Sequence, residues 1–155
     1  MTEAKDSLFE TVVAFFQSDD WPIQLVEGDQ ALRTAFRGES GQWTCYARVR
    51  GAHEQVCFYS VCPINVPEAQ RGAVGEYLHR ANYGMIIGNF EMDFSDGEVR
   101  YKTSLDVEGD RLTVALVRQL VIANVMMMDR YLPGLMAVTY GDVTPAAAIA
   151  EIEKH

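Results

Sequence analysis

The stretch that decides the fold runs over residues 32–62, LRTAFRGESGQWTCYARVRGAHEQVCFYSVC. Apolar and polar side chains alternate along three segments of it, which is the pattern of strands that bury one face. When Arg37 is placed opposite Gln42, and Val49 opposite Val56, the large apolar side chains of all three segments fall on one side. Such agreement fixes strand register, so the stretch predicts three antiparallel strands joined by two turns.

Helical patterns lie on both sides of these strands. A first amphipathic helix, capped by Asp6 or Ser7, is predicted to end near Ser18, because Trp21-Pro22 follows it. A second helix is predicted over about residues 68–83, where apolar side chains recur at helical spacing.

A second hairpin follows this helix. Residues 88–94 and 98–105 alternate around a Ser-Asp-Gly turn at residues 95–97, and Asp-Gly between alternating runs is a strong hairpin signal. The outer faces of the two strands predict a cross-strand charge ladder of Glu91, Asp93, Arg100 and Lys102.

A long helix is predicted from about Thr113 to Asp129, and a short last helix begins at Thr144-Pro145. The segment between Ile23 and Glu27 is a candidate for a short extra strand. The element order is therefore α-β-β-β-α-β-β-α plus a C-terminal helix. This order predicts a two-layer α+β fold with an antiparallel sheet of about five strands, in one domain over residues 1–155.

Composition narrows the function classes. The chain has 155 residues and a formal net charge of −9, which disfavours binding to nucleic acid, whose phosphates need a basic surface. Three cysteines and no export signal in MTEAKDSLFE predict a cytoplasmic protein with reduced thiols. Charged and polar residues interrupt the longest apolar run, so no membrane span is expected.

One segment resembles a known family. NYGMIIGNFEMD at residues 82–93, followed by DGEVRY at residues 96–101, resembles the central pattern of YbjN-domain proteins. These are bacterial proteins described as sensory transduction regulators, and the resemblance extends over most of the chain. It implies a fold similar to type III secretion chaperones, small acidic proteins that commonly dimerise. The family brings no established catalytic residues, so none is carried over.

No pattern for catalysis, metal or cofactor binding emerges. The cysteines at positions 45, 57 and 62 and the histidines at 53, 79 and 155 lack the spacing of metal ligands. Cys57 could reach His53 only across a turn, with no acidic group to orient the histidine. The GxxxG at residues 84–88 lies between a helix and a strand, which fits no phosphate-binding loop. We therefore expect no catalytic residue, no metal, no cofactor and no enzymatic activity.

The outer face of the predicted first sheet carries a candidate binding strip. The register places Arg33 opposite Tyr46, Arg48 opposite Cys57, and Tyr46 opposite Tyr59. Arginine and tyrosine supply charge-assisted and stacking contacts, so Arg33, Tyr46, Arg48 and Tyr59 are candidate binding residues. Two alternatives remain open: the strip packs under the chain's own acidic N-terminal segment, or it is an ordinary solvated sheet face.

The long helix carries two apolar stripes, and a helix that is apolar on most sides is buried on most sides. It is either a central helix held by the chain itself, or one stripe forms a homodimer or partner face. The first stripe is the candidate face and comprises Val114, Val117, Val121, Val125 and Met128. The second stripe comprises Leu112, Leu116, Leu120, Ala123 and Met127.

The sequence thus favours a non-enzymatic protein-binding module, chaperone-like or regulatory, that forms a homodimer and has a protein partner. The alternative is a ligand-sensing domain that binds a small anionic molecule on the arginine and tyrosine strip. Neither nucleic acid nor a membrane is an expected partner.

Overall fold

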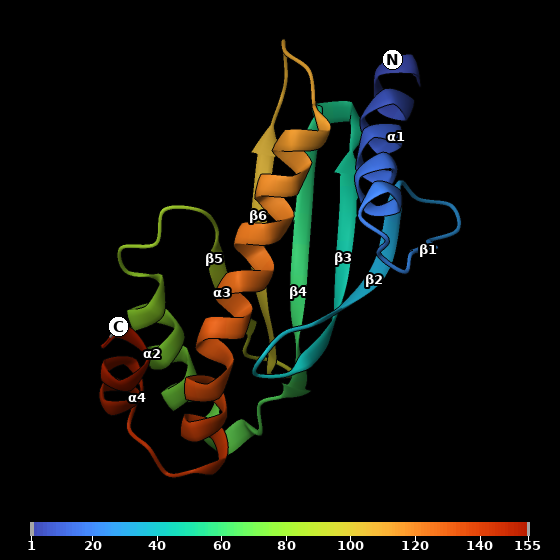
Figure 1. Ribbon diagram of the computed structural model, residues 1–155. Coiled ribbons are helices and arrows are strands. Elements are labelled where there is room, and N and C mark those ends of the chain that lie inside the picture. The colour runs from blue at the N-terminus through green and yellow to red at the C-terminus, as the bar shows by residue number, and fades with distance from the viewer. Residues whose placement is uncertain (1, 155) are drawn as a thin grey trace.

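The computed structural model describes residues 2–154 and has an α+β fold, shown in Figure 1. Six antiparallel strands form one sheet, in the order β1-β2-β3-β4-β6-β5. Short 3₁₀ turns at Gly51–His53 and Glu68–Gln70 precede β4 and α2. The elements in chain order are α1 (Thr2–Ser18), β1 (Gln24–Leu25), β2 (Ala31–Arg37), β3 (Gln42–Arg50), β4 (Gln55–Asn65), α2 (Arg71–Asn82), β5 (Asn89–Asp93), β6 (Glu98–Asp106), α3 (Val114–Tyr140) and α4 (Pro145–Glu153).

The predicted register of the first three strands is confirmed. Arg37 lies opposite Gln42, and Val49 lies opposite Val56. Burial alternates strictly along β3 and β4, which places the apolar side chains of both strands on the same face. The short strand β1 adds to these and brings the sheet to six strands instead of about five.

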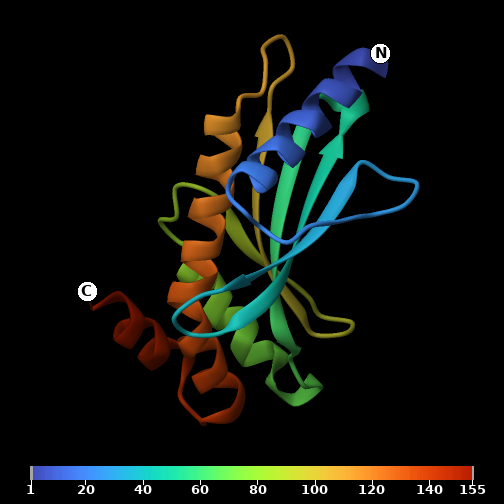
Figure 2. The same cartoon turned by 45° about the vertical axis from the view of Figure 1, so that its right-hand side comes forward.

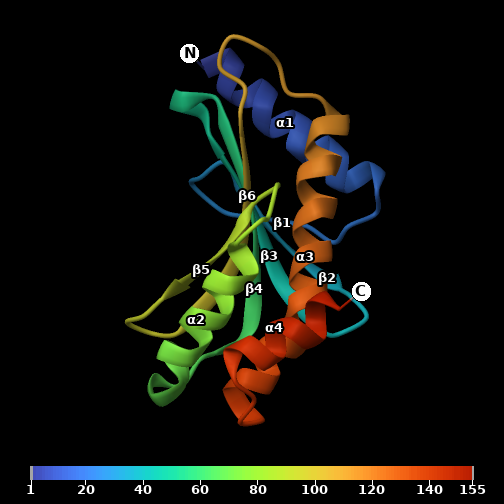
Figure 3. The same cartoon turned by 90° about the vertical axis from the view of Figure 1, so that its left-hand side faces the viewer.

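Helices cover one face of this sheet. Figure 3 shows β3 and β4 near edge-on, with α1 and α3 on one side of them. The α2 helix packs beside β5 and α3, and α4 packs against α2 and α3. The expected two-layer arrangement is therefore confirmed, and the second face of the sheet lies bare over residues 2–154.

The second hairpin forms as predicted, with one difference in its charge ladder. Glu91 accepts hydrogen bonds from Arg100 at 2.8 Å and from Lys102 at 3.0 Å. Asp93 instead accepts from the backbone N–H and the hydroxyl of Ser95, and so it caps the turn. Gly97 in this turn has φ +79°, and a Cβ there would collide with the backbone of the segment before α2.

Two helix boundaries differ from prediction. The first helix begins at Thr2, earlier than the Asp6 or Ser7 cap suggested. The long helix is capped by Thr113, whose hydroxyl accepts from the Leu116 N–H, but it continues past Asp129 to Tyr140.

Contacts from distant segments let α3 continue through Pro133. Proline has no N–H to donate to the carbonyl four residues earlier. That carbonyl belongs to Asp129, and the Ser40 hydroxyl donates to it at 2.6 Å (the turn that carries Ser40 reaches α3 in Figure 2). Gly134 leaves room for the Tyr77 ring, and the Tyr77 hydroxyl donates to the Tyr131 carbonyl at 2.7 Å. Gly134 therefore serves packing, and the helix continues through both Pro133 and Gly134.

Buried residues of α3 hold the helix against the sheet. Val117, Val121, Val125 and Met128 are each at most 1% exposed. Among them lies Asn124, which is fully buried. Its amide Nδ2 donates to the carbonyls of Phe58 and Tyr101 and to the Thr103 hydroxyl, at 2.9, 3.0 and 3.2 Å. This side chain ties the middle of α3 to β4 and β6.

Candidate functional site

The bare face of the sheet, called the outer face below, is rich in basic residues. Six of the chain's 13 lysines and arginines project from it, although the chain has a net charge of −9. Acidic side chains lie on the same face at Glu91, Asp93, Glu98 and Asp106. The six cations are Arg33, Arg37, Arg48, Arg50, Arg100 and Lys102.

Strand register brings the four predicted binding residues together on this face. Arg33 lies opposite Tyr46, and Tyr46 lies opposite Tyr59. Arg48 follows Tyr46 on the same face of β3, opposite Cys57. The positions are as expected from the sequence, and the binding role of Arg33, Tyr46, Arg48 and Tyr59 stays a prediction.

Two further cations from β3 and β6 enlarge the strip. Arg50 extends it along β3, and the Arg100 guanidinium lies over the Tyr59 ring, 4.4 Å from its centroid. The sequence reading placed Arg100 in the second hairpin and could not connect it to Tyr59. The pairing of β4 with β6 makes that connection, because Tyr59 lies opposite Lys102, two residues from Arg100.

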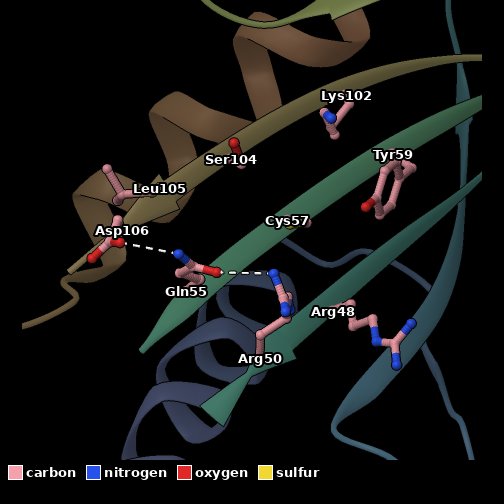
Figure 4. A pocket seen from close by; sticks show the side chains of 9 residues that line it. All are labelled: Arg48, Arg50, Gln55, Cys57, Tyr59, Lys102, Ser104, Leu105 and Asp106. Atoms are coloured by element: carbon pink, nitrogen blue, oxygen red, sulfur yellow. Dashed lines mark hydrogen bonds between the residues drawn. The ribbon is translucent and has the colours of Figure 1, made fainter. Parts of the chain in front are cut away.

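An open hollow of about 480 Å³ lies over β3, β4 and β6, and Figure 4 shows its lining side chains. Arg48, Arg50 and Lys102 contribute its positive charge. Arg50 donates to the Gln55 amide oxygen at 3.1 Å, and Gln55 donates to the Asp106 carboxylate at 3.0 Å. Hydrogen bonds from Gln55 and from a backbone N–H lower the pKa of Asp106, so this carboxylate is ionised at neutral pH.

A second open hollow of about 570 Å³ adjoins the first and is lined by Tyr46, Arg48, Tyr59 and Arg100. Asp29 also lines it, and its carboxylate lies 3.6 Å from the Arg48 guanidinium. Of the acidic N-terminal segment, only the turn that carries Asp29 contacts the strip. The acidic helix α1 lies on the opposite face of the sheet.

The protonation of the strip is set by its neighbours. Partial burial and the Cys57 thiol raise the pKa of Tyr59 above its ordinary value, against the opposing charge of Arg100, so the phenol stays neutral. Partial burial alone would raise the pKa of Glu91. Hydrogen bonds from Lys102 and Arg100 outweigh that effect and lower the Glu91 pKa, so one carboxylate serves two cations.

A second surface is apolar, and its loop residues were not foreseen from the sequence. In the loop between α2 and β5, Tyr83, Ile86 and Ile87 are 91, 89 and 54% exposed. Ile122 and Met126 are 41 and 58% exposed on α3. We call these five residues the loop–α3 surface. The three loop residues line a hollow of about 410 Å³, together with Ala123 and Met127 of α3. Ile122 and Met126 directly precede these two α3 residues in the sequence.

The loop–α3 surface lies partly within the segment that carried the family resemblance. A signal for it was present in the sequence, because Met85-Ile86-Ile87 is an apolar run between two glycines and outside any predicted element. An apolar run is usually buried, however, and only the structure shows that Ile86 and Ile87 face outward.

The candidate partner face on the long helix lies inside the chain's own core. Val114 is partly buried, and the other four members of that stripe are fully buried between α3 and the sheet. This arrangement corresponds to the alternative of a central helix held by the chain itself. A contact on the described surface of α3 would use Ile122 and Met126 instead. The stripe in question is Val114, Val117, Val121, Val125 and Met128.

Two of the three cysteines, Cys45 and Cys62, are buried and are not activated nucleophiles. Burial raises the pKa of Cys45 to about 12 and that of Cys62 to about 11, so both thiols stay protonated and inert. Among the described side chains of residues 7–154, no group of three or more histidine, cysteine or acidic residues could hold a metal ion. In the same part of the chain, no helix is long and apolar enough to span a membrane.

One antiparallel sheet with helices on a single face, a bare outer face and an apolar loop define an α+β protein similar to type III secretion chaperones. The YbjN family model, described as "Putative bacterial sensory transduction regulator", matches residues 9–136, and the chain belongs to this family. No curated protein sequence matches the chain.

Three solved structures are similar to this chain, and the first two support the fold. A crystal structure of "YbjN, a putative transcription regulator from E. coli" is similar with a TM-score of 0.58 and 11% identity, covering 86% of this chain and 90% of that one. The ExsC–ExsE complex gives a TM-score of 0.54 and 10% identity, with 83% and 93% covered. The HopA1–SchA chaperone–effector complex gives 0.48 and 14%, with 81% and 93% covered.

Proposed function

We propose that the protein is a non-enzymatic, cytoplasmic module that binds another protein in a chaperone-like or regulatory role. The observation that carries this proposal is the loop–α3 surface. A cluster of large apolar side chains is unfavourable in contact with water. Burial of such a cluster against a partner is favourable by about 25 cal/mol for each Å² of apolar surface. Ile86 at 89% exposure and Tyr83 at 91% are the side chains with most to gain.

The comparisons support this role. Membership of a family described as a sensory transduction regulator points to regulation rather than to catalysis. One similar fold, ExsC, was solved in complex with ExsE, so this architecture can hold a second protein.

The test replaces two members of the surface by charged residues, as Ile86→Asp together with Ile122→Asp. Leu25→Asp is the matched control, because Leu25 is 59% exposed on β1, away from the loop. Wild-type and variant proteins are used for crosslinking capture from the native cell lysate, with quantitative mass spectrometry. We expect at least one protein retained by wild type and by the control to fall by about tenfold or more with the double variant. Identical capture by all three proteins would refute the role of this surface.

We further propose that the chain forms a homodimer. The test is light scattering at micromolar concentration, where a mass of two chains is expected. A mass of one chain would remove the homodimer from the proposal, and it would leave the binding of a different protein to the capture experiment.

A second candidate function is a ligand-sensing domain that binds a small anionic molecule on the strip. The observation that favours it is the hollow of about 480 Å³ lined by Arg48, Arg50 and Lys102. Inorganic phosphate and small dicarboxylates are the probes. Changing Arg48 and Arg50 to alanine should then abolish the thermal stabilisation that such a probe produces, and unchanged stabilisation would eliminate this candidate.

A further inference from the structure

We infer that the outer face of the sheet binds an acidic segment of the protein partner in an extended conformation, along β3 and across to β6. The inference rests on the protein-binding role proposed above, but it uses a different surface from the loop–α3 surface. It names the chemistry of the partner: a stretch of chain with carboxylates at alternate positions.

The first argument is the charge that the outer face leaves unneutralised. Among the ion pairs of residues 2–154, none involves Arg33, Arg37 or Arg50. Arg50 contacts a neutral amide, that of Gln55. Glu91 alone serves both cations of β6. The face therefore keeps basic groups free for an acidic partner, on a chain whose net charge is −9.

The second argument is spacing. Arg48 and Arg50 are two residues apart on one strand, so their side chains leave the sheet about 6.8 Å apart. Arg100 and Lys102 repeat this spacing on β6. An extended peptide presents every second side chain on one side with the same period of about 6.8 Å. Carboxylates at alternate positions of a segment that runs along β3 can therefore lie over Arg48 and Arg50 with the spacing of those two cations.

The third argument is that a carboxylate already reaches the strip. Asp29, on the exposed turn before β2, lies 3.6 Å from Arg48, and the two side chains remain 42 and 59% exposed. An exposed ion pair with so long a distance between its charged atoms stabilises the fold by at most about 1 kcal/mol. A partner's carboxylate can replace Asp29 at small cost.

Tyrosines complete the surface. Tyr46 is 38% exposed, and its neighbour Tyr59 is partly buried beneath Arg100. Between the cations these rings offer flat apolar area for the backbone and the uncharged side chains of an extended segment.

The probe is a fluorescently labelled peptide of about ten residues that alternates glutamate and threonine and spans about 34 Å when extended. Affinity is measured by fluorescence anisotropy at low salt and again at about 0.15 M salt, where exposed charges are partly screened. Arg48→Ala with Arg50→Ala is the test variant. Arg80→Ala with Arg111→Ala is the control, since it removes the same charge from sites off the outer face.

We expect the alternating peptide to bind wild type and the control alike, and to bind the test variant about tenfold more weakly. Reversal of the charges, as Arg48→Glu with Arg50→Glu, should transfer binding to a peptide that alternates lysine and threonine. Equal affinity for wild type and the test variant would overturn the inference.

Three competitors test the identity of the occupant. A peptide of the same composition with its glutamates in one block should bind at least about threefold more weakly, because its charges do not match the strand period. Equal binding of the block peptide, displacement by millimolar inorganic phosphate, or tighter binding of single-stranded DNA would each overturn an extended acidic segment as the occupant.

Failure of this inference can be told apart from failure of the proposed function. The Ile86→Asp/Ile122→Asp variant leaves the outer face intact and should bind the acidic peptide as wild type does. If wild type captures a partner through the loop–α3 surface but does not bind the peptide, only the outer-face inference fails. If the peptide binds but the capture of no lysate protein depends on the loop–α3 surface, the proposed role of that surface is refuted and the outer-face inference is supported.

Discussion

The two faces of the one sheet differ in almost every physical respect. On the covered face, Leu32, Phe58 and Tyr101 are fully buried against helices, and Asn124 of α3 reaches down to the strand carbonyls. On the outer face, Arg48 and its neighbours contact solvent and each other through exposed ion pairs. Successive side chains of a strand point to opposite faces. One residue of a strand can therefore stabilise the core while the next residue contacts a partner. Substitutions can therefore separate the two roles.

The largest effect is expected on the covered face, at Asn124. Asn124→Ala removes the two N–H donors that the carbonyls of Phe58 and Tyr101 and the Thr103 hydroxyl share, and it leaves a small cavity between α3 and the sheet. We expect the free energy of unfolding to fall by about 2–4 kcal/mol, measured by urea denaturation.

The matched control for this change is Gln119→Ala, on the exposed side of the same helix. It should alter the free energy of unfolding by no more than about 0.5 kcal/mol. If Asn124→Ala lowered the free energy of unfolding as little as the control does, the buried contacts of Asn124 would not be a main source of stability on the covered face.

A smaller loss is expected at Asp129, where α3 meets the turn between β2 and β3. Its carboxylate accepts from the backbone N–H groups of Glu39 and Ser40, at 3.0 and 2.8 Å, and lies 2.6 Å from the Ser40 hydroxyl, whose single hydrogen it shares with the Asp129 carbonyl. Asp129→Asn offers a single weaker acceptor to these donors. We expect a loss of about 1–2 kcal/mol at pH 7 in urea denaturation.

This loss should depend on pH in a defined direction. Partial burial alone would raise the Asp129 pKa, but the hydrogen bonds from Ser40 and Glu39 outweigh it and hold the pKa below its ordinary value of 3.8. Stability from a depressed pKa is present above the unfolded value and is lost as the pH falls through the folded value. The difference between wild type and Asp129→Asn should therefore shrink below about pH 3.8, and a constant difference down to pH 2 would contradict this origin.

The smallest effect is expected on the outer face, at Asp29. Asp29→Asn removes the carboxylate that lies beside Arg48, so the acidic peptide should bind two- to fivefold more tightly, with stability unchanged within about 0.5 kcal/mol. Glu27→Gln makes the same change of charge on the same turn, away from any ion pair among the described residues, and serves as control. Equal gains for both variants would assign the effect to net charge rather than to the Arg48 contact.

The sequence predicted the sheet well because its information is local. The register of residues 32–62 that was chosen because it puts Phe36, Trp43 and Phe58 on a common side is the one observed. The positions of Arg33, Tyr46, Arg48 and Tyr59 on the outer face follow from the same constraint, which is why the strip could be placed before any coordinates.

The end of α3 was not predictable from local pattern. Pro133 and Gly134 together are a common stop signal for a helix. Their true meaning depends on Ser40, which satisfies the carbonyl that Pro133 leaves free, and on Tyr77, which needs the space at Gly134. Neither partner is near in sequence, so the helix was expected to end near Asp129 and in fact reaches Tyr140.

Exposure of the loop–α3 surface also depends on tertiary structure. A helix that is apolar on most sides is expected to be covered everywhere, yet α4 and the α2–β5 loop leave Ile122 and Met126 open. The valine stripe that was the sequence's candidate for a partner is instead the part of α3 that the sheet covers.

The contact between Ser40 and the helix has a consequence for how the sequence can change over generations. Loss of the Ser40 hydroxyl removes the hydrogen-bond donor that the Asp129 carbonyl receives in place of the missing N–H of Pro133. If position 133 first regained an N–H, the same loss at position 40 would be tolerated more easily, so the effects of the two changes do not add. The substitutions that are tolerated at position 40 therefore depend on the residue at position 133, more than ninety residues away.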